Sequence, residues 1–287
     1  MNNLDNGLLD GFELFLAQNV YKKESFHPHF EKAMVEMFEA GGKRFRPLLL
    51  LSVVDAYEPL LLQNSFYVAT AIEMLHTYSL IHDDLPTFDD SPLRRGKQTL
   101  HVTYGEVTAT LVGDALNTDS FLMIAEAPLS DKVKVALIRE FSKNSGSGGM
   151  VLGQAIDCFF EEKKLTIEQL KFLHIHKTAK LIAVSLKMGA IIVDLPLNQQ
   201  NLLYDIGIKL GLLFQVQDDI IDATMSSDEA GKPTGNDTIK NSFTNLLGID
   251  GAIKEKNILL NELFDDIQKL DKKLKYKLEN IINRYFK

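Results

Sequence analysis

Apolar residues recur every three or four positions along most of the chain, which is the spacing of an α-helix that buries one face. This spacing is clear from Phe66 to His82 and again from Leu202 to Ile221. We expect a further helix from Pro47 to about Tyr57, because the first turn of a helix tolerates proline. Strand-like alternation is scarce, so the pattern predicts an all-α protein.

Prolines punctuate this pattern and mark where helices are expected to end. They stand at Pro59, Pro86, Pro92, Pro128, Pro196 and Pro233. The sequence has no internal repeat and no linker-like stretch, so we predict a single domain of residues 1–287 with about ten helices. The glycine-rich run Ser145–Gly149 lacks the GK[ST] ending of a phosphate-binding loop, and we expect a tightly packed turn or helix there.

The composition of the chain limits which classes of molecule it could bind and in which setting it could work. Hydrophobic residues make up 45% of the chain, enough for a large core, and the net charge of -8 argues against a nucleic-acid ligand. Cys158 is the single cysteine, which excludes an intrachain disulfide and suits a reducing, cytoplasmic setting. The first residues lack the basic segment and apolar run of a signal peptide. The most apolar run, beside Pro47, is shorter than the ~20 residues that span a membrane, so we expect no membrane insertion.

A first acidic cluster follows the helix predicted from Phe66 to His82. Its carboxylates are Asp83, Asp84, Asp89 and Asp90. The helix should end near Asp84, because a residue that precedes a proline disfavours the α conformation and Pro86 follows closely. Carboxylates at a helix C-terminus oppose the helix dipole at a cost of up to about 1 kcal/mol each. Mg²⁺ bound by Asp83 and Asp89 would offset that cost. Taken alone, however, the cluster is explained equally well as a solvated acidic loop.

A second acidic cluster, Asp218, Asp219 and Asp222, lies within the predicted helix from Leu202. Asp218 and Asp222 are four residues apart and share a helix face, where like charges are unfavourable. The flanks are apolar, and the segment from Leu210 to Asp222 has no lysine or arginine to make a mixed, solvated face. We therefore expect this carboxylate pair to face an interior cavity. Two such clusters on separate helices suggest a cage of metal ions around one polyanion.

Basic residues supply candidate contacts for a second anion. Lys43 and Arg46 lie beside the pair Gly41–Gly42 and just before a predicted helix, a setting that favours phosphate. Arg94 and Arg95 follow the first acidic cluster, where they could pair with its aspartates or face a substrate. His76 is two turns before Asp83 on the same face, although a lone helical histidine is more often a core residue. Further cations, whose spacing does not single them out, are Lys177, beside Thr178, and Lys232.

In their order along the chain these motifs resemble the trans-prenyl diphosphate synthase family, bacterial farnesyl diphosphate synthases in particular. The matching blocks, between Gly41 and Gly248, are GGKRFRP, HTYSLIHDDLPTFDD, LRRGK, GDAL, GQAID, HKTAKLI, FQVQDDIID, GKPTGND and LLG. The combination is specific, whereas any one block is not. The resemblance implies a single bundle of mostly antiparallel helices around a deep cavity, a homodimer, and Mg²⁺ as cofactor.

The resemblance also implies roles for individual residues. Three Mg²⁺ ions would be held on the allylic diphosphate by Asp83, Asp84, Asp89, Asp218, Asp219 and Asp222. Isopentenyl diphosphate would be bound by Lys43, Arg46, His76 and Arg95, beside Gly42. The allylic diphosphate would also contact Arg94, Lys177 and Lys232, and Lys240 is the match for a further family lysine. Thr178 and Gln215 would lie near the developing carbocation, and Phe214 near the isopentenyl chain.

The chain departs from the family pattern in several places. Ser91 and Pro92 follow the first acidic cluster where further acids are frequent, and Leu152 replaces a frequent glycine. The segment around Lys240 is about two residues short of the family pattern, by count of the residues that follow GKPTGND. The match of the C-terminal Arg284 and Lys287 to the basic tail of the family is only suggestive.

The predicted activity is condensation of an allylic diphosphate, geranyl or dimethylallyl, with isopentenyl diphosphate by ionisation, condensation and proton loss. By resemblance Tyr78, next to the small Ser79, forms the floor that limits the product to fifteen carbons. On an ideal helical wheel Ser79 lies closer than Tyr78 to the face of Asp83. The alternatives are a geranylgeranyl diphosphate synthase, a class I terpene cyclase, which needs a second motif of Asn/Ser/Glu type, and a non-catalytic synthase subunit, which tends to lose aspartates.

Overall fold

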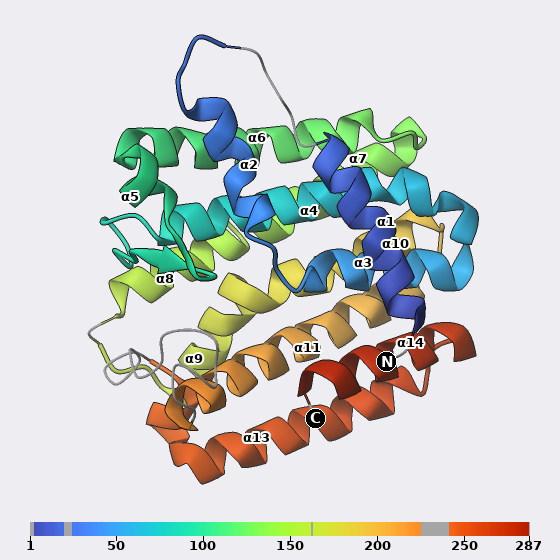
Figure 1. The fold of residues 1–287 in the computed structure, drawn as a ribbon. Helices are drawn as coiled ribbons and strands as arrows, with labels where there is room; N and C mark the ends of the chain where they lie inside the picture. The colour runs from blue at the N-terminus through green and yellow to red at the C-terminus, as the bar shows by residue number, and fades with distance from the viewer. Residues whose placement is uncertain (1–2, 20–24, 162, 225–240, 287) are drawn as a thin grey trace. The chain divides into compact units, whose positions relative to one another are not determined.

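A computed structural model describes residues 3–19, 25–161, 163–224 and 241–286 of the chain (Figure 1). Within these residues almost all regular structure is helical, which confirms the predicted all-α fold. Close contacts group the chain into two compact units. Unit 1 comprises residues 1–51 and 62–134, and unit 2 comprises residues 52–61 and 135–287. The single domain and its deep cavity stay predictions.

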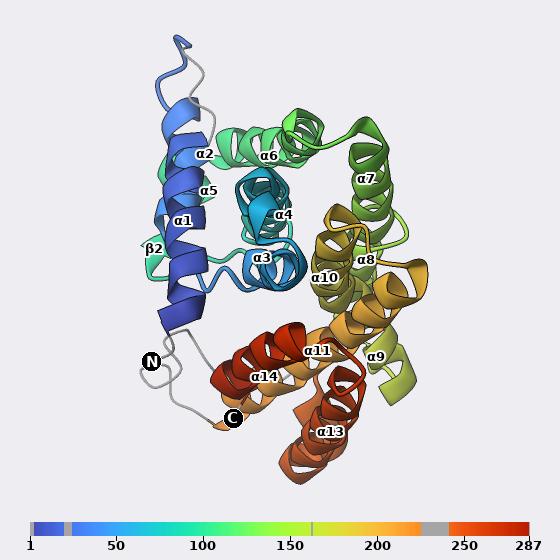
Figure 2. The same cartoon turned by 90° about the vertical axis from the view of Figure 1, so that its right-hand side faces the viewer.

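Unit 1 is built around helix α4, which runs from Leu62 to Asp83 and is buried over most of its length. It packs along α6, as Figures 1 and 2 both show, and also contacts α1. The other elements that lie in this unit or begin in it are α1 (Asn3–Asn19), α2 (Phe30–Glu39), α3 (Phe45–Tyr57), β1 (Leu93–Arg94), β2 (Lys97–Gln98), α5 (Leu100–Tyr104) and α6 (Glu106–Glu126).

Two of these elements show how the sequence sets helix ends. α4 ends at Asp83, as predicted from the proline that follows, and α3 begins at Phe45, so Pro47 lies in its first turn. At the far end of α4, the ring of His82 lies against Gly113 of α6. A Cβ at Gly113 would come within 2.2 Å of the His82 Nε2, so a larger residue there would force the His82 ring to move.

Unit 2 is organised on the long helix α11, Leu197–Thr224, which lies between α10 (Lys180–Ile192) and α13 (Phe243–Ile267) in both views (Figures 1 and 2). Helix α10 buries almost every residue, and α11 buries the apolar positions that predicted it. The remaining elements that lie or end in this unit are η1 (Pro59–Leu61), α7 (Asp131–Ser145), α8 (Met150–Phe159), α9 (Ile167–His174), the π-helical turn η2 (Ile175–Ala179) and α14 (Lys272–Phe286).

The structure resolves two local questions. The glycine-rich run forms a turn between α7 and α8, where a Cβ at Gly149 would come within 1.9 Å of the Asn144 carbonyl oxygen, so the predicted tight turn is confirmed. The LRRGK block forms a hairpin of two residues per strand, which the alternation pattern could not indicate because it is too short.

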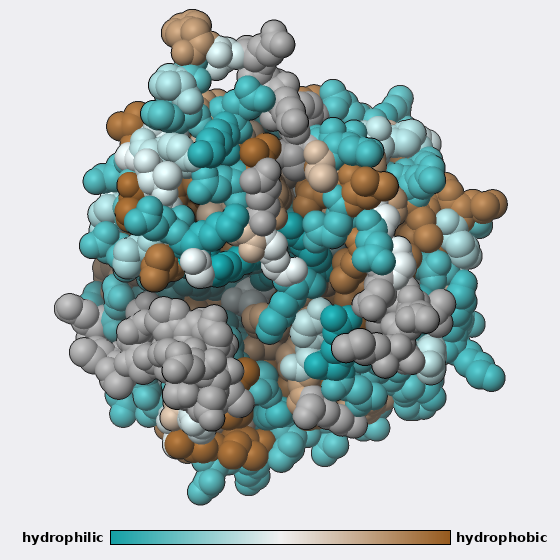
Figure 3. All heavy atoms as spheres, viewed as in Figure 1, coloured by the Kyte–Doolittle hydropathy of each residue, from teal (hydrophilic) through white to brown (hydrophobic). Residues whose placement is uncertain are grey.

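The described surface is mostly polar. In the face shown in Figure 3, hydrophilic side chains dominate and apolar ones occur in scattered groups. No helix in the described ranges is both long and apolar enough to cross a membrane.

Candidate active site

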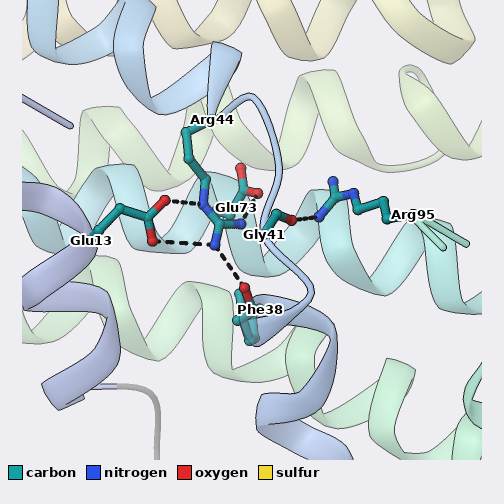
Figure 4. A network of polar contacts seen from close by, with 6 residues as sticks. All are labelled: Glu13, Phe38, Gly41, Arg44, Glu73 and Arg95. Carbon is teal, nitrogen blue, oxygen red and sulfur yellow. Dashed lines mark hydrogen bonds and ion pairs between the residues drawn. The ribbon is translucent and has the colours of Figure 1, made fainter. Parts of the chain in front are cut away.

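The loop Gly41–Arg44 of unit 1 connects α2 to α3 and is anchored by Arg44 (Figure 4). The Arg44 guanidinium, 4% exposed, donates to Glu73 Oε1 at 2.8 Å, Glu13 Oε1 at 2.6 Å and the Phe38 carbonyl oxygen at 2.8 Å. Although burial opposes its charge, the hydrogen bonds and charges of both glutamates raise the pKa of Arg44. Arg44 is therefore a structural cation within the predicted basic motif.

Arg46, His76 and Arg95 form a group of basic side chains near this loop. Burial lowers the pKa of Arg46 to about 10, with Glu73 opposing this shift and Arg95 adding to it. Burial and the arginines around it hold the pKa of His76 well below its ordinary value, so the imidazole is neutral at pH 7. The Nε of Arg46 is buried and has no hydrogen-bond partner in the described ranges. Buried arginines whose pKa values are lowered by burial and by neighbouring arginines are suited to receive a polyanion.

Arg94 and Arg95, adjacent in the hairpin, have different partners. Arg94 donates from Nε to both carboxylate oxygens of Asp84, at 2.7 and 2.9 Å. Arg95, with a positive φ of 53°, donates to the Gly41 carbonyl oxygen (Figure 4). The sequence left open whether these arginines pair with the aspartates, and the structure pairs Arg94 with Asp84 while directing Arg95 to the loop.

The first acidic cluster separates into one buried carboxylate, Asp84, and three more accessible ones, Asp83, Asp89 and Asp90. Asp84 is 2% exposed; burial raises its pKa and the bonds from Arg94 oppose that shift. Asp83 is half-buried and Asp89 is exposed. The turn that contains Pro86 brings them together, because the Asp89 backbone N–H donates to the Asp83 carbonyl oxygen at 2.9 Å. This turn places Asp83 and Asp89 as the outward carboxylates of the cluster.

Tyr78 and Ser79 occupy α4 one to two turns before this cluster. The Tyr78 ring meets the His82 ring edge-on, with centroids 5.1 Å apart. Burial and the neighbouring Asp83 and Asp114 raise the pKa of Tyr78. The Ser79 hydroxyl donates to the His76 carbonyl oxygen at 2.8 Å, so it is satisfied within the helix.

In unit 2, Lys177 and Thr178 belong to the π-helical turn η2. The Lys177 ammonium donates to the Asp157 carboxylate of α8. Gly153 of α8 lies so close that a Cβ there would come within 2.1 Å of the Lys177 backbone nitrogen. Single π-helical turns inside α-helices often occur at functional sites. The turn fixes where Lys177 and Thr178 project.

A relay of hydrogen bonds joins η2 to α11 and α13. Thr178 Oγ1 donates to Gln215 Oε1 at 3.4 Å, and Gln215 Nε2 donates to Asp219 Oδ1 at 3.0 Å. The Phe243 backbone N–H donates to Asp219 Oδ2 at 2.7 Å. Asp219 is 4% exposed. The structure thus brings together Thr178 and Gln215 and engages both oxygens of the middle aspartate with protein donors.

Asp218 and Asp222 are half-buried on one face of α11, one turn apart. Phe214 precedes them on the same helix and meets Phe286 of α14, with ring centroids 6.3 Å apart. The second cluster therefore repeats the division of the first. Its middle aspartate is held by the protein, and its outer two are more accessible.

These outer carboxylates fit a hard cation that completes its shell with water and ligand oxygens. Mg²⁺ usually takes only one or two protein carboxylates together with water and phosphate oxygens. No group of three or more histidine, cysteine, aspartate or glutamate side chains in the described ranges is arranged to hold a metal by itself. The pairs Asp83–Asp89 and Asp218–Asp222 supply the oxygen donors that shared coordination needs.

Some predicted residues lie elsewhere, and others were missed. Lys232 and Lys240 lie outside the described residues. Lys43 is exposed on the anchored loop, beside Gly42. Sequence reasoning missed the partners Glu73 and Asp157. Glu73 left a signal, since it is a lone carboxylate in the apolar stretch of α4, whereas Asp157 stands in a matched block without a spacing that marks its role.

Comparisons with known proteins give independent evidence about the family of this chain. A family model described as polyprenyl synthetase matches residues 27–281. The farnesyl diphosphate synthase of Geobacillus stearothermophilus is 46% identical over 233 residues, which cover 79% of this chain and 77% of the relative. The chloroplastic geranylgeranyl pyrophosphate synthase of Catharanthus roseus is 40% identical, covering 81% and 66%. A solved Helicobacter pylori geranyltransferase, complexed with magnesium and isoprenyl diphosphate, is 45% identical with a TM-score of 0.93, covering 99% of this chain and 97% of that one.

Proposed function

Because the chain belongs to the polyprenyl synthetase family, we propose that it is a Mg²⁺-dependent prenyltransferase that condenses isopentenyl diphosphate with geranyl or dimethylallyl diphosphate to give farnesyl diphosphate. The observation that carries this proposal is the pairing of two kinds of site. In each aspartate cluster one carboxylate is anchored by the protein and at least two others are accessible, and a separate group of basic side chains lies around Arg46.

The aspartates hold the allylic diphosphate through metal ions. In our proposal Asp83, Asp89, Asp218 and Asp222 would coordinate three Mg²⁺ ions, which would supply charge neutralisation for the leaving diphosphate. Asp84 and Asp219, committed to Arg94 and to the α13 backbone, support these ligands from behind. Because Arg94 is tied to Asp84, its contact with the allylic diphosphate would be made by the donors that remain.

The cations of unit 1 bind isopentenyl diphosphate. Arg46 and Arg95 supply fork-shaped donors for the diphosphate, and Lys43 adds a point charge. The neutral His76 ring donates a hydrogen bond without adding charge to the crowded group. Affinity for isopentenyl diphosphate therefore depends on these side chains.

The residues of η2 and α11 act on the reacting carbons. Lys177, and Lys232 beyond the described ranges, contact the allylic diphosphate, as does Lys240. Breaking the allylic C–O bond leaves a carbocation, and the oxygen-bearing side chains of Thr178 and Gln215 stabilise it. The alkene of isopentenyl diphosphate then forms the new C–C bond. The departing diphosphate takes the proton that is lost.

Product length and assembly complete the proposal. The half-buried Tyr78 ring, braced by His82, limits the product to fifteen carbons rather than twenty. The similarity to a geranylgeranyl synthase keeps the twenty-carbon product as the alternative. Helix α6 exposes a stripe of Val107, Leu111 and Leu122, which a second copy would cover in a homodimer. The single cysteine supports a cytoplasmic location.

The proposed metal role is tested with Asp83→Ala, compared with Asp90→Ala. Asp90 belongs to the same cluster and is exposed, and the Nε2 atom of His101 lies 3.8 Å from its carboxylate. We expect Asp83→Ala to lower turnover by about a hundredfold or more, because a first metal ligand is lost, while Asp90→Ala stays within about threefold of wild type. Steady-state elongation of geranyl diphosphate at varied Mg²⁺ measures both. An Asp83→Ala variant with near-wild-type activity at low Mg²⁺ would refute the metal role.

A further inference from the structure

The backbone of the loop Gly41–Arg44 is held in an unusual conformation. Gly41 has a φ of 75°, and Arg44, which has a large side chain, has a φ of 45°. The left-handed region is unfavourable for residues other than glycine, and it persists only where surrounding contacts impose it. The contacts of Arg44 therefore determine the shape of this loop.

Three separate elements hold the Arg44 guanidinium. Glu13 comes from α1, Glu73 from α4, and the Phe38 carbonyl from α2, and all three point at the same side chain in Figure 4. Arg44 and Glu73 are both buried. A buried ion pair with this many hydrogen bonds fixes geometry well, because each partner is costly to leave unpaired.

The cations proposed to bind isopentenyl diphosphate depend on this loop for their positions. Arg95 donates to the Gly41 carbonyl oxygen, and its guanidinium lies against Gly42, where a Cβ would come within 2.8 Å of the Arg95 Nη1 atom. Arg46 follows Arg44 by two residues, at the start of α3. A shift of the loop would move both guanidinium groups.

Glu73 is also a potential competitor for those cations. Burial lowers the pKa of Arg46 and of Arg95, and the Glu73 charge acts on both in the opposite direction. A Glu73 carboxylate released from Arg44 would be a buried, unpaired anion, which would pair with whichever cation it reached. The 2.8 Å bond from Arg44 keeps Glu73 Oε1 occupied.

We propose that Arg44 is a positioning residue for isopentenyl diphosphate, which, clamped between Glu13 and Glu73, fixes the loop and keeps the Glu73 carboxylate from pairing with Arg46 and Arg95. The inference rests on the proposed function. It concerns affinity for isopentenyl diphosphate and leaves ionisation of the allylic diphosphate unchanged.

The test compares Arg44→Gln with the double variant Arg44→Gln/Glu73→Gln. We expect Arg44→Gln to raise the KM for isopentenyl diphosphate about tenfold, with kcat and the KM for geranyl diphosphate within about twofold of wild type. The KM of the double variant for isopentenyl diphosphate should be at least about threefold lower than that of Arg44→Gln. The reason is that an uncharged amide in place of the Glu73 carboxylate does not compete for the guanidinium groups. A residue that served only stability would not produce this recovery.

Lys187→Gln is the matched control, since it breaks a largely buried ion pair, Lys187–Glu140 at 3.0 Å, in unit 2. Its KM for isopentenyl diphosphate should equal that of wild type. If Arg44→Gln does not fold, Glu13→Gln removes one arm of the clamp from a side chain that is 46% exposed, and a KM about threefold higher is expected.

An unchanged KM in a folded Arg44→Gln variant, or no recovery in the double variant, would overturn the inference; where Arg44→Gln does not fold, an unchanged KM in Glu13→Gln would do so. A wild-type protein that fails to elongate would instead contradict the proposed function, so the two failures are distinguishable.

Discussion

His174 is a histidine that the fold keeps neutral. It is buried at the end of α9, and neither ring nitrogen has a hydrogen-bond partner within the described ranges. Its ring stacks on Phe243, with centroids 5.5 Å apart. Burial lowers the pKa of His174 to about 4, with Lys177 acting in the same direction and Asp157 against it. Protonation in the folded state would place an unsatisfied charge beside the relay that ends at Asp219.

This depressed pKa predicts acid sensitivity with a defined sign. Above pH ~6.5 the histidine is neutral in both folded and unfolded chains, whereas between pH ~6.5 and ~4 only the unfolded chain binds the proton. Stability is therefore lost as pH falls through this window. From pH 7 to pH 5, wild type should lose about 2 kcal/mol more than His174→Leu. Urea unfolding at both pH values measures this, and equal losses in the two proteins would contradict it.

At the scale of single residues, the sequence predicted which residue types make up the candidate site. It did not predict which of them are held by other groups of the protein. Charge and spacing marked the two aspartate clusters as candidate metal ligands, and the resemblance to the family implied the full ligand set. That Asp84 and Asp219 are consumed by Arg94 and by the Phe243 backbone depends on tertiary contacts. Glu13 and Arg44, 31 residues apart, show the same limit. No local pattern marks either pairing.

At the scale of elements, the π-helical turn η2 is locked by glycine. A Cβ at Gly153 would meet the Lys177 backbone nitrogen at 2.1 Å and its Cα at 2.4 Å, and these backbone atoms cannot rotate away. Gly211 of α11 makes a similar approach to Ala179, at 2.3 Å. The turn that carries Lys177 and Thr178 is thus pressed between two helices through residues without side chains.

Gly153→Ala should therefore displace η2. We expect a loss of about 1–3 kcal/mol in stability from overpacking, together with a fall in kcat as Lys177 and Thr178 move. Gly7→Ala in α1 is the control, because a Cβ there meets nothing within 4 Å and alanine favours helix. Chemical denaturation measures the change in stability, and steady-state kinetics measures the change in kcat. A Gly153→Ala variant as stable and active as wild type would show that η2 tolerates displacement.

Element boundaries were predictable where a local rule governs them. Apolar periodicity located α4 and α11, and Pro86, within the first acidic cluster, located the end of α4. The π-helical turn was not predictable, since His-Lys-Thr lies in a continuous helical pattern and the bulge arises from packing on Gly153 and Gly211. The hairpin at Arg94 was missed because two residues per strand leave no alternation to detect.

At the scale of the whole molecule, the order of motifs identified the family before any contact was known. The order of the motifs does not predict the hydrogen bonds between segments that are far apart in the chain. The Asn241 side chain, for example, donates to the Phe160 and Lys163 carbonyl oxygens and accepts from the Leu165 N–H. These hydrogen bonds connect the segment between α8 and α9 to Asn241, which lies two positions before the start of α13. Such contacts span more than 70 positions in the chain and obey no spacing rule.

The most direct test of the central claim is the product formed by the purified wild-type protein from geranyl diphosphate and radiolabelled isopentenyl diphosphate with Mg²⁺. We expect one main labelled product of fifteen carbons, which disappears when the metal is chelated. A main product of twenty carbons would contradict the role given to Tyr78. Diphosphate release without elongation, as in a cyclase, or no turnover, as in a non-catalytic subunit, would contradict the proposed function itself.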